Sequence, residues 1–239
     1  MSNENANENI NIQKLSQIKL DKIDFSDAST VGKNRNVFIT YKSESFGSDD
    51  NLIIQFADDM KIPFDISERE TEFFKEGKKV SKTNYTITLN FNMYNEKHKK
   101  TMERLEKLDK YILQQAQKNS MDWFGKTVSK DELKKVYSPF LAYSKDRNFA
   151  SIRFRLPTQK DKFVTRVYLK RESVDLKENL IKGSYITPIG RFNNIWITNQ
   201  GKFGTTWDLQ LAKMNEPKVN TQKSELSKLV KLKVTPRKS

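Results

Sequence analysis

The sequence predicts a mainly β protein of the α+β class, with one long helix and a short second helix inserted between its strands. Apolar residues alternate with polar ones along 83–91, 150–156 and 203–211, which is the period of half-buried strands. From Asn95 to Asn119 apolar residues instead recur at spacings of three and four, as on one side of a helix. The 239 residues suffice for one substantial core, or for one domain with a small appendage.

The first part of the chain is rich in Asn, Glu, Lys and Ser, so residues 1–30 are predicted to be a disordered leader. The folded domain would then span 31–214. Its early strands are expected at 37–41, 52–56 and 61–66, separated by turn-prone residues. The charged stretch 68–82 is expected to be a loop or a short helical turn, before a strand at 83–91.

A helical insertion is expected at about 95–137. Its long helix carries Lys and Arg on the polar side, and a solvated face explains them better than a binding face does. A short second helix is predicted to begin at Ser129, because Ser129 and Glu132 have the spacing of a capping box. Pro139 ends it.

The next strands carry the most informative alternation in the chain. Even positions of 150–156 are apolar, which places Arg153 and Arg155 together on the opposite face. Odd positions of 163–170 form the apolar side, and the other side presents Arg166, Tyr168 and Lys170. These outward faces are therefore cationic and aromatic.

Residues 183–214 are expected to form three short strands in a meander, broken at 188–190, 193–194 and 199–201. Trp207 shares its parity with Leu209 and is predicted to lie in the core, whereas Trp196 has the outward parity. Phe203 also has the parity of Trp207, and exposure by the turn at Gly201–Gly204 is the alternative. The candidate nucleic-acid-binding residues are Arg153, Arg155, Arg166, Tyr168, Lys170, Trp196, Lys202 and Phe203.

Composition supports a polyanionic partner, because 44 Lys and Arg stand against 30 Asp and Glu, a net charge of +14. Cysteine is absent and His98 is the single histidine, which excludes thiolate sites, a His-based triad and a multi-histidine metal site. Asp49-Asp50 and Asp58-Asp59 are better explained as turn formers than as magnesium ligands. We therefore expect no enzymatic activity, no metal and no cofactor. We expect no membrane partner either, because no run of eighteen apolar residues occurs.

The end of the chain, 215–239, is predicted to be a flexible basic tail that adds phosphate contacts. A solubilising tail and a nuclear-import signal are the alternatives.

The spacing of Trp196, Gly201-Lys202, Gly204 and Trp207, preceded by Trp123-Phe124-Gly125-Lys126, resembles a family encoded by nucleocytoplasmic large DNA viruses. That family is similar to viral single-stranded-DNA-binding proteins with an OB-fold, which are related to the phage type. The resemblance covers about Thr83 to Met214. It implies an OB-fold-like barrel with a helical insertion, whose strand face and loops bind oligonucleotides. Phage-type proteins end in an acidic tail that docks replication partners, whereas this chain ends in a basic one.

The predicted function is binding of single-stranded DNA without strong sequence preference, in viral DNA replication, recombination or repair. Cations would follow the phosphates and aromatic rings would stack on unpaired bases. An RNA-binding protein and a DNA-packaging virion structural protein are the alternatives. A homo-oligomer or replication proteins are the further partners we expect. The expected location is the host cell cytoplasm at the viral replication site, the nucleus, or the virion.

Overall fold

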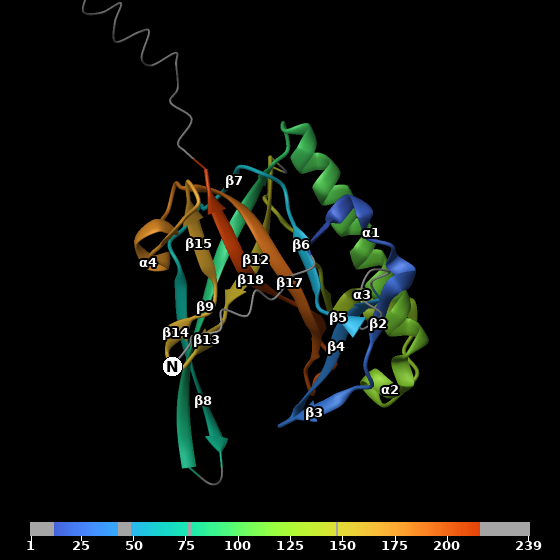
Figure 1. Cartoon of the computed structure of the whole chain (residues 1–239). Helices are drawn as coiled ribbons and strands as arrows, with labels where there is room; N and C mark the ends of the chain where they lie inside the picture. The colour runs from blue at the N-terminus through green and yellow to red at the C-terminus, as the bar shows by residue number, and fades with distance from the viewer. Residues whose placement is uncertain (1–11, 43–48, 76–77, 147, 216–239) are drawn as a thin grey trace, which may run out of the picture.

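The structure, a computed structural model, describes residues 12–42, 49–75, 78–146 and 148–215. Most described strands join one mixed sheet, and a separate two-stranded hairpin, β13–β14, lies beside it. The fold is mainly β with helices at its side, which confirms the predicted class (Figure 1).

The strands are β1 (Ile12–Lys14), β2 (Ile23–Phe25), β3 (Ser29–Val31), β4 (Asn34–Lys42), β5 (Asp49–Asp50), β6 (Leu52–Gln55), β7 (Met60–Lys61), β8 (Ser67–Lys75), β9 (Lys78–Asn92), β10 (Tyr137–Ser138), β11 (Ala142–Tyr143), β12 (Phe149–Leu156), β13 (Thr158–Gln159), β14 (Lys162–Phe163), β15 (Arg166–Leu169), β16 (Glu172–Val174), β17 (Tyr185–Ile197) and β18 (Phe203–Met214). The helices are α1 (Glu96–Lys118), α2 (Ser120–Phe124), α3 (Lys130–Val136) and α4 (Leu176–Asn179), with 3-10 turns η1 (Leu15–Gln17) and η2 (Leu20–Lys22). The first three helices pack together beside β2 and β4, while α4 lies next to β15 (Figure 1).

The pairings run in a circuit from β17 through β7, β9, β12 and β18 back to β17. Two links of this circuit are short. β7 meets β9 only at Lys61 and Asn90, and β12 meets β18 only at Arg155 and Asp208. The sheet is therefore partly ring-like, and the predicted barrel is realised only to that extent.

An aromatic cluster fills the inner side of this ring. Trp207 stacks on Phe192 with 4.7 Å between ring centroids and an interplanar angle of 9°. The ring of Phe56 meets Phe154 and Trp207 edge-on. Trp207 is 3% exposed, which confirms its predicted place in the core. Such rings bury large apolar areas and prefer offset or edge-to-face contacts, so this cluster contributes much of the stability.

The helices begin where the sequence predicts them. The Asn95 side chain accepts hydrogen bonds from the backbone N–H groups of Lys97 and His98 and caps α1. Both hydrogen bonds of the Ser129–Glu132 capping box are present at α3. The buried side of α1 packs on η1, β9, α2 and α3; it consists of His98, Met102, Leu105, Leu108, Asp109, Ile112 and Ala116.

The predicted disordered leader is wrong for its described part, residues 12–30. This segment forms strands and 3-10 turns, and it buries Leu15 and Ile23 in the core. β1 pairs with β6, and β2 pairs with β4. This segment is too short to fold alone, and its order comes from these pairings with strands that lie later in the chain. Residues 1–11 of the leader lie outside the described ranges.

The stretch 68–82 is a strand hairpin rather than a loop. β8 pairs with β9 from Ser67↔Thr86 to Lys75↔Lys78, and the hairpin projects beyond the rest of the molecule (Figure 1). Apolar alternation does not predict this hairpin, because the described side chains at 68–72 and 79–83 are exposed and mostly polar.

Three further boundaries differ from the prediction. Residues 185–197 form one strand, β17, because register shifts next to Ile189 and Phe192 absorb the expected breaks. Residues 163–170 are divided between β14 and β15, and the expected strand at 61–66 shrinks to β7. No helix within the described ranges is long and apolar enough to span a membrane.

Candidate nucleic-acid interface

The sheet face opposite the aromatic core carries the predicted cations and rings. Paired residues on neighbouring strands point to the same side, and residues next to each other on one strand point to opposite sides. Asp208 follows the buried Trp207 and therefore points away from the core. Its partners across the pairing are Arg155 on β12 and Arg191 on β17. We call this side the outer face.

The register extends the outer face toward both ends of β17. Trp196 pairs with Gly204, and Asn194 pairs with Thr206, both with the parity of Asp208. On β4, Phe38 pairs with Asn194, and it is 50% exposed. Trp196 and Phe38 thus bring two aromatic side chains to the outer face.

At the other end of β18, a register shift decides where Arg166 and Tyr168 point. Gly190 faces the core, because a side-chain carbon there would lie 2.5 Å from the Phe154 ring. Its neighbour Ile189 therefore lies on the outer face with its partner Leu211. Arg166 pairs with Leu211, and Tyr168 lies two residues further along β15. The structure therefore brings the predicted residues of three strands to one face; they are Arg153, Arg155, Arg166, Tyr168 and Trp196.

Asp208 is an ion-pair centre within this face. It is fully buried and accepts hydrogen bonds from Arg155 at 2.6 and 3.0 Å and from Arg191 at 2.8 Å. A buried carboxylate needs such partners, because an unpaired charge removed from water is costly. Arg155 is thus engaged by the protein itself, whereas Arg153 and Arg166 are exposed and have no carboxylate partner among the described residues.

The Trp196 side chain is partly exposed and lies against the backbone of β18. A side-chain carbon at Gly204 would come within 2.6 Å of the Trp196 ring, so the glycine makes room for it. The indole N–H donates to the Thr205 carbonyl at 3.4 Å. These contacts fix the orientation of the ring before any ligand arrives.

Phe203 does not belong to this interface. It is fully buried, and its ring lies 5.2 Å from Phe124 and 4.9 Å from Tyr137, between centroids. Its parity is that of Trp207, and the neighbouring helix α2 and strand β10 cover it, so the turn does not expose it. Lys202 is exposed in that turn, two residues before Gly204, the partner of Trp196. Lys170 is exposed in the β15–β16 turn, with φ of 51°.

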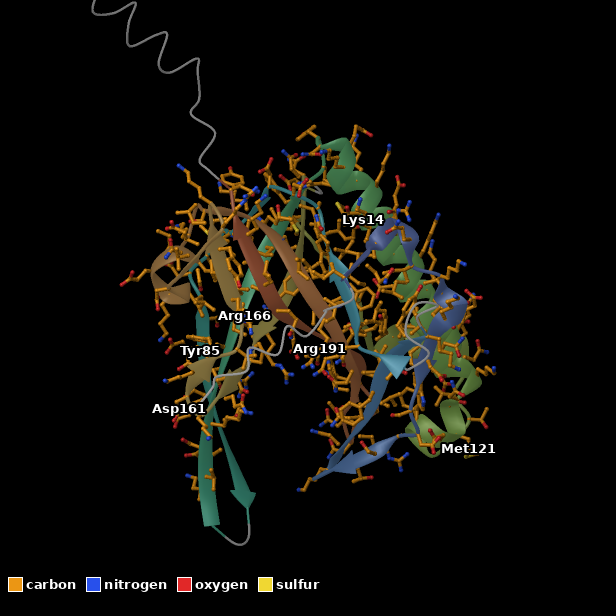
Figure 2. All side chains as sticks on the ribbon, viewed as in Figure 1. Lys14, Tyr85, Met121, Asp161, Arg166 and Arg191 are labelled. Atoms are coloured by element: carbon orange, nitrogen blue, oxygen red, sulfur yellow. The ribbon has the colours of Figure 1, made fainter. Side chains whose placement is uncertain are left out.

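The structure adds residues that the sequence did not single out. Arg191 stands at the centre of the outer face, near Arg166 in Figure 2. The tip of the β13–β14 hairpin presents Lys160 and Lys162, and a cavity of about 880 Å³ beside it is also lined by Arg166. The exposure of Phe38 follows from its parity against the apolar Val37 and Ile39, and this signal was available in the sequence.

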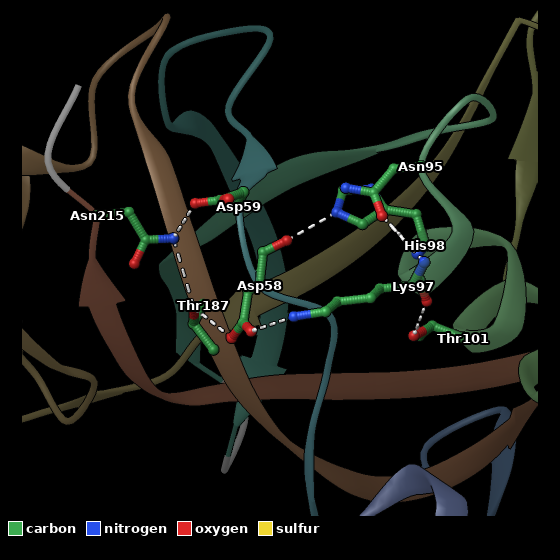
Figure 3. A network of polar contacts seen from close by, with 8 residues as sticks. All are labelled: Asp58, Asp59, Asn95, Lys97, His98, Thr101, Thr187 and Asn215. Carbon is green, nitrogen blue, oxygen red and sulfur yellow. Dashed lines mark hydrogen bonds and ion pairs between the residues drawn. The ribbon is translucent and has the colours of Figure 1, made fainter. Parts of the chain in front are cut away.

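Asp58 and Asp59 serve as hydrogen-bond acceptors at the edge of the sheet (Figure 3). The Asp58 carboxylate accepts from the Thr187 hydroxyl at 3.0 Å, and Asp59 accepts from the Asn215 amide at 2.8 Å. The His98 ring accepts from the Asn92 N–H and donates to the Asp58 carbonyl at 2.7 Å. Within the described ranges no group of three or more His, Asp or Glu side chains could hold a metal ion.

Comparisons with known proteins give a family and a distant structural likeness. No curated protein matches the sequence. Among solved structures, the chain is similar to a single-stranded DNA-binding protein from bacteriophage Enc34, in a C-terminally truncated form, with a TM-score of 0.37 and 12% identity over 82% of this chain and 98% of that one. A family model matches residues 77–226, which is most of the chain. The protein therefore belongs to DUF5871, a family of unknown function.

Proposed function

We propose that this protein binds single-stranded DNA without strong sequence preference through the outer face. The observation that carries the proposal is the strand register, which places Arg153 and Arg166, neither with a carboxylate partner among the described residues, on the same face as Trp196 and Phe38. The chemistry of a single strand requires this mixture. Cations follow the phosphates, and aromatic planes stack on unpaired bases for about 1–3 kcal/mol per base.

Duplex DNA would use the cations of such a face but not its rings, because paired bases are already stacked. The net charge of +14 supports a polyanion as partner and does not by itself select one. The strand-face aromatics therefore favour the single strand. We further propose a non-enzymatic role in viral DNA replication, recombination or repair, at the replication site in the cytoplasm or nucleus. The family resemblance of 83–214 supports this setting.

The test is a titration of the full chain with single-stranded DNA, duplex DNA and RNA of one length at matched salt, followed by fluorescence anisotropy. We expect the tightest binding to single-stranded DNA, little difference between base compositions, and quenching of tryptophan fluorescence on binding. Tighter binding of RNA than of DNA would mean that the outer face is an RNA-binding surface. Equal affinity for duplex and single strand without quenching would contradict the proposal.

A further inference from the structure

A second cationic concavity lies away from the outer face. The start of β4, helices α2 and α3, and the turn between β17 and β18 enclose a pocket of about 580 Å³. Its lining includes four cations and one carboxylate, namely Lys33, Arg35, Lys126, Lys135 and Glu132. This volume falls within the roughly 300–1,000 Å³ of pockets that bind small molecules.

The pocket and the outer face are separate sites. Arg35 pairs with Ile197, and Ile197 is buried next to Trp196 on β17. Since neighbouring residues on a strand point to opposite sides, Arg35 and Trp196 lie on different faces of the sheet. A ligand in the pocket would therefore not touch the rings of the outer face.

The single carboxylate of the pocket, Glu132, lies near Lys126 and Lys135 and balances only part of the positive charge of the pocket. The Glu132 carboxylate is held at the start of α3, where it accepts from the Ser129 N–H at 2.9 Å. One guanidinium nitrogen of Arg35, Nη1, donates to the carbonyls of Asp122 and Trp123, at 3.1 and 3.3 Å. No described residue accepts a hydrogen bond from Nε or Nη2 of Arg35, and no carboxylate of a described residue forms an ion pair with this guanidinium.

The walls of the pocket hold the Arg35 guanidinium in position and leave space beside it. Gly125, at φ of 73°, lies against the guanidinium, and a side-chain carbon there would be 3.5 Å from Nη2. The carbonyls at the end of α2 hold the group from one side. Apolar side chains line another part of the pocket, including Phe124, Val128 and Val136.

We propose that this pocket binds the phosphate of a nucleotide, with the sugar and base on the apolar wall. A guanidinium held by one nitrogen keeps further donors for phosphate oxygens, which it binds in a forked geometry. Lys33, Lys126 and Lys135 add charge around the same space. The nucleotide is either free in solution or the phosphorylated end of a strand. The inference stands on different residues from those of the proposed function.

The experiment is calorimetric titration of the full chain with ATP, and with adenosine as the uncharged control. We expect saturable binding of ATP and much weaker binding of adenosine. Lys135→Gln and Lys126→Gln should each weaken ATP binding by roughly three- to tenfold, the range expected for a charge-assisted contact. Lys134→Gln is the matched control, because Lys134 sits on the same helix, pairs with Asp131 and does not line the pocket.

Oligonucleotides with and without a 5′ or 3′ phosphate distinguish the two sources of the nucleotide. A preference for a phosphorylated end that Lys135→Gln abolishes, without binding of ATP, assigns the pocket to strand ends. Absence of both effects overturns the inference, and so does an equal loss in Lys134→Gln and Lys135→Gln. Trp196→Ala should leave ATP binding unchanged, so a failure of this site and a failure of the outer face are distinguishable.

Discussion

Single residues of the outer face have two kinds of role, and the Asp208 network separates them. Arg155 and Arg191 share one buried carboxylate, whereas Arg166 has no such partner among the described residues. A substitution of Arg155 therefore changes the stability of the fold as well as the charge of the outer face. Arg166→Ala is the cleaner test of a phosphate contact, and the slope of log affinity against log salt should fall by about 0.7.

Asp208→Asn should lower the free energy of unfolding by about 2–3 kcal/mol. Breaking a fully buried ion pair costs more than this. Here the cost is smaller, because both arginine side chains reach solvent and water can solvate their charges. Urea unfolding measures the change. Asp161→Asn, in an exposed turn at φ of 60° that asparagine also tolerates, is the control and should have the stability of the parent. A fully stable Asp208→Asn would show that the network contributes nothing to folding.

The two tryptophans of β17 and β18 should respond differently to truncation. Trp196→Ala should cost about 1–3 kcal/mol of affinity for single-stranded DNA with little change in salt slope, because stacking releases no counterions. Trp207→Ala should instead cost about 3–5 kcal/mol of stability, since it empties the aromatic core. Anisotropy titration and thermal unfolding separate the two effects. Unfolding of Trp196→Ala with native stability of Trp207→Ala would mean that the assigned faces are exchanged.

Asp109 makes stability depend on pH. Burial raises the pKa of this carboxyl from 3.8 to about 6, although the Tyr137 hydroxyl and the Phe140 N–H donate to it. Between these two values the folded state binds more protons than the unfolded state, so stability falls as pH rises through that window. The loss should be at most about 3 kcal/mol. Asp109→Asn should flatten this part of the profile in urea unfolding, while Glu103→Gln, exposed on the same helix, should not.

At the scale of elements, the long hairpin and the ring have different importance for stability. β17 and β18 pair along most of their lengths and carry both the core and the outer face. The outer part of the β8–β9 hairpin buries nothing in the core, since its described residues from Glu68 to Thr83 are exposed. Its strands are held mainly by their own hydrogen bonds.

Replacing 70–83 with a two-residue Asn-Gly turn should leave the free energy of unfolding within about 1 kcal/mol of the parent. Arg69 and Asn84 are paired, and a turn of this type closes such a pair without strain. Urea unfolding checks the stability. A loss of several kcal/mol would show that the hairpin is part of the folding core.

At the scale of the whole molecule, the folded domain is followed in the sequence by a segment rich in positive charge. The described domain ends at Asn215, whose amide is fixed by Asp59 and Thr187 (Figure 3). The predicted basic tail lies beyond it, outside the described ranges, with Lys218, Lys223, Lys228, Lys231, Lys233, Arg237 and Lys238 against two glutamates. Seven positive charges against two negative ones favour attraction to a polyanion.

Deleting 218–239 should weaken binding of single-stranded DNA and reduce its salt dependence, by about 0.7 in slope for each lost phosphate contact. The melting temperature should stay close to that of the parent, because the pinned Asn215 is retained. Anisotropy titrations over a salt series and calorimetry measure the two quantities. A large fall in melting temperature would place the deleted segment within the fold.

The sequence by itself determined the fold class, the position of α1, the capping box of α3 and the opposite faces of Trp196 and Trp207. Each of these depends on local periodicity or on contacts between near neighbours, which the order of residues encodes directly. The burial of Phe203 is not determined in this way. Its exposure depended on whether a distant helix covers the turn, and α2 and β10 do cover it.

Only the tertiary structure decided which strands lie side by side. The pairing of Arg155 with Asp208, the order in residues 12–30 and the pocket around Arg35 all join segments far apart in the chain. Such contacts are selected by the packing of the whole core and by register shifts, such as the one between Ile189 and Gly190 that turns Arg166 outward. A local pattern gives the two faces of each strand, and only the pairing assembles those faces into one surface.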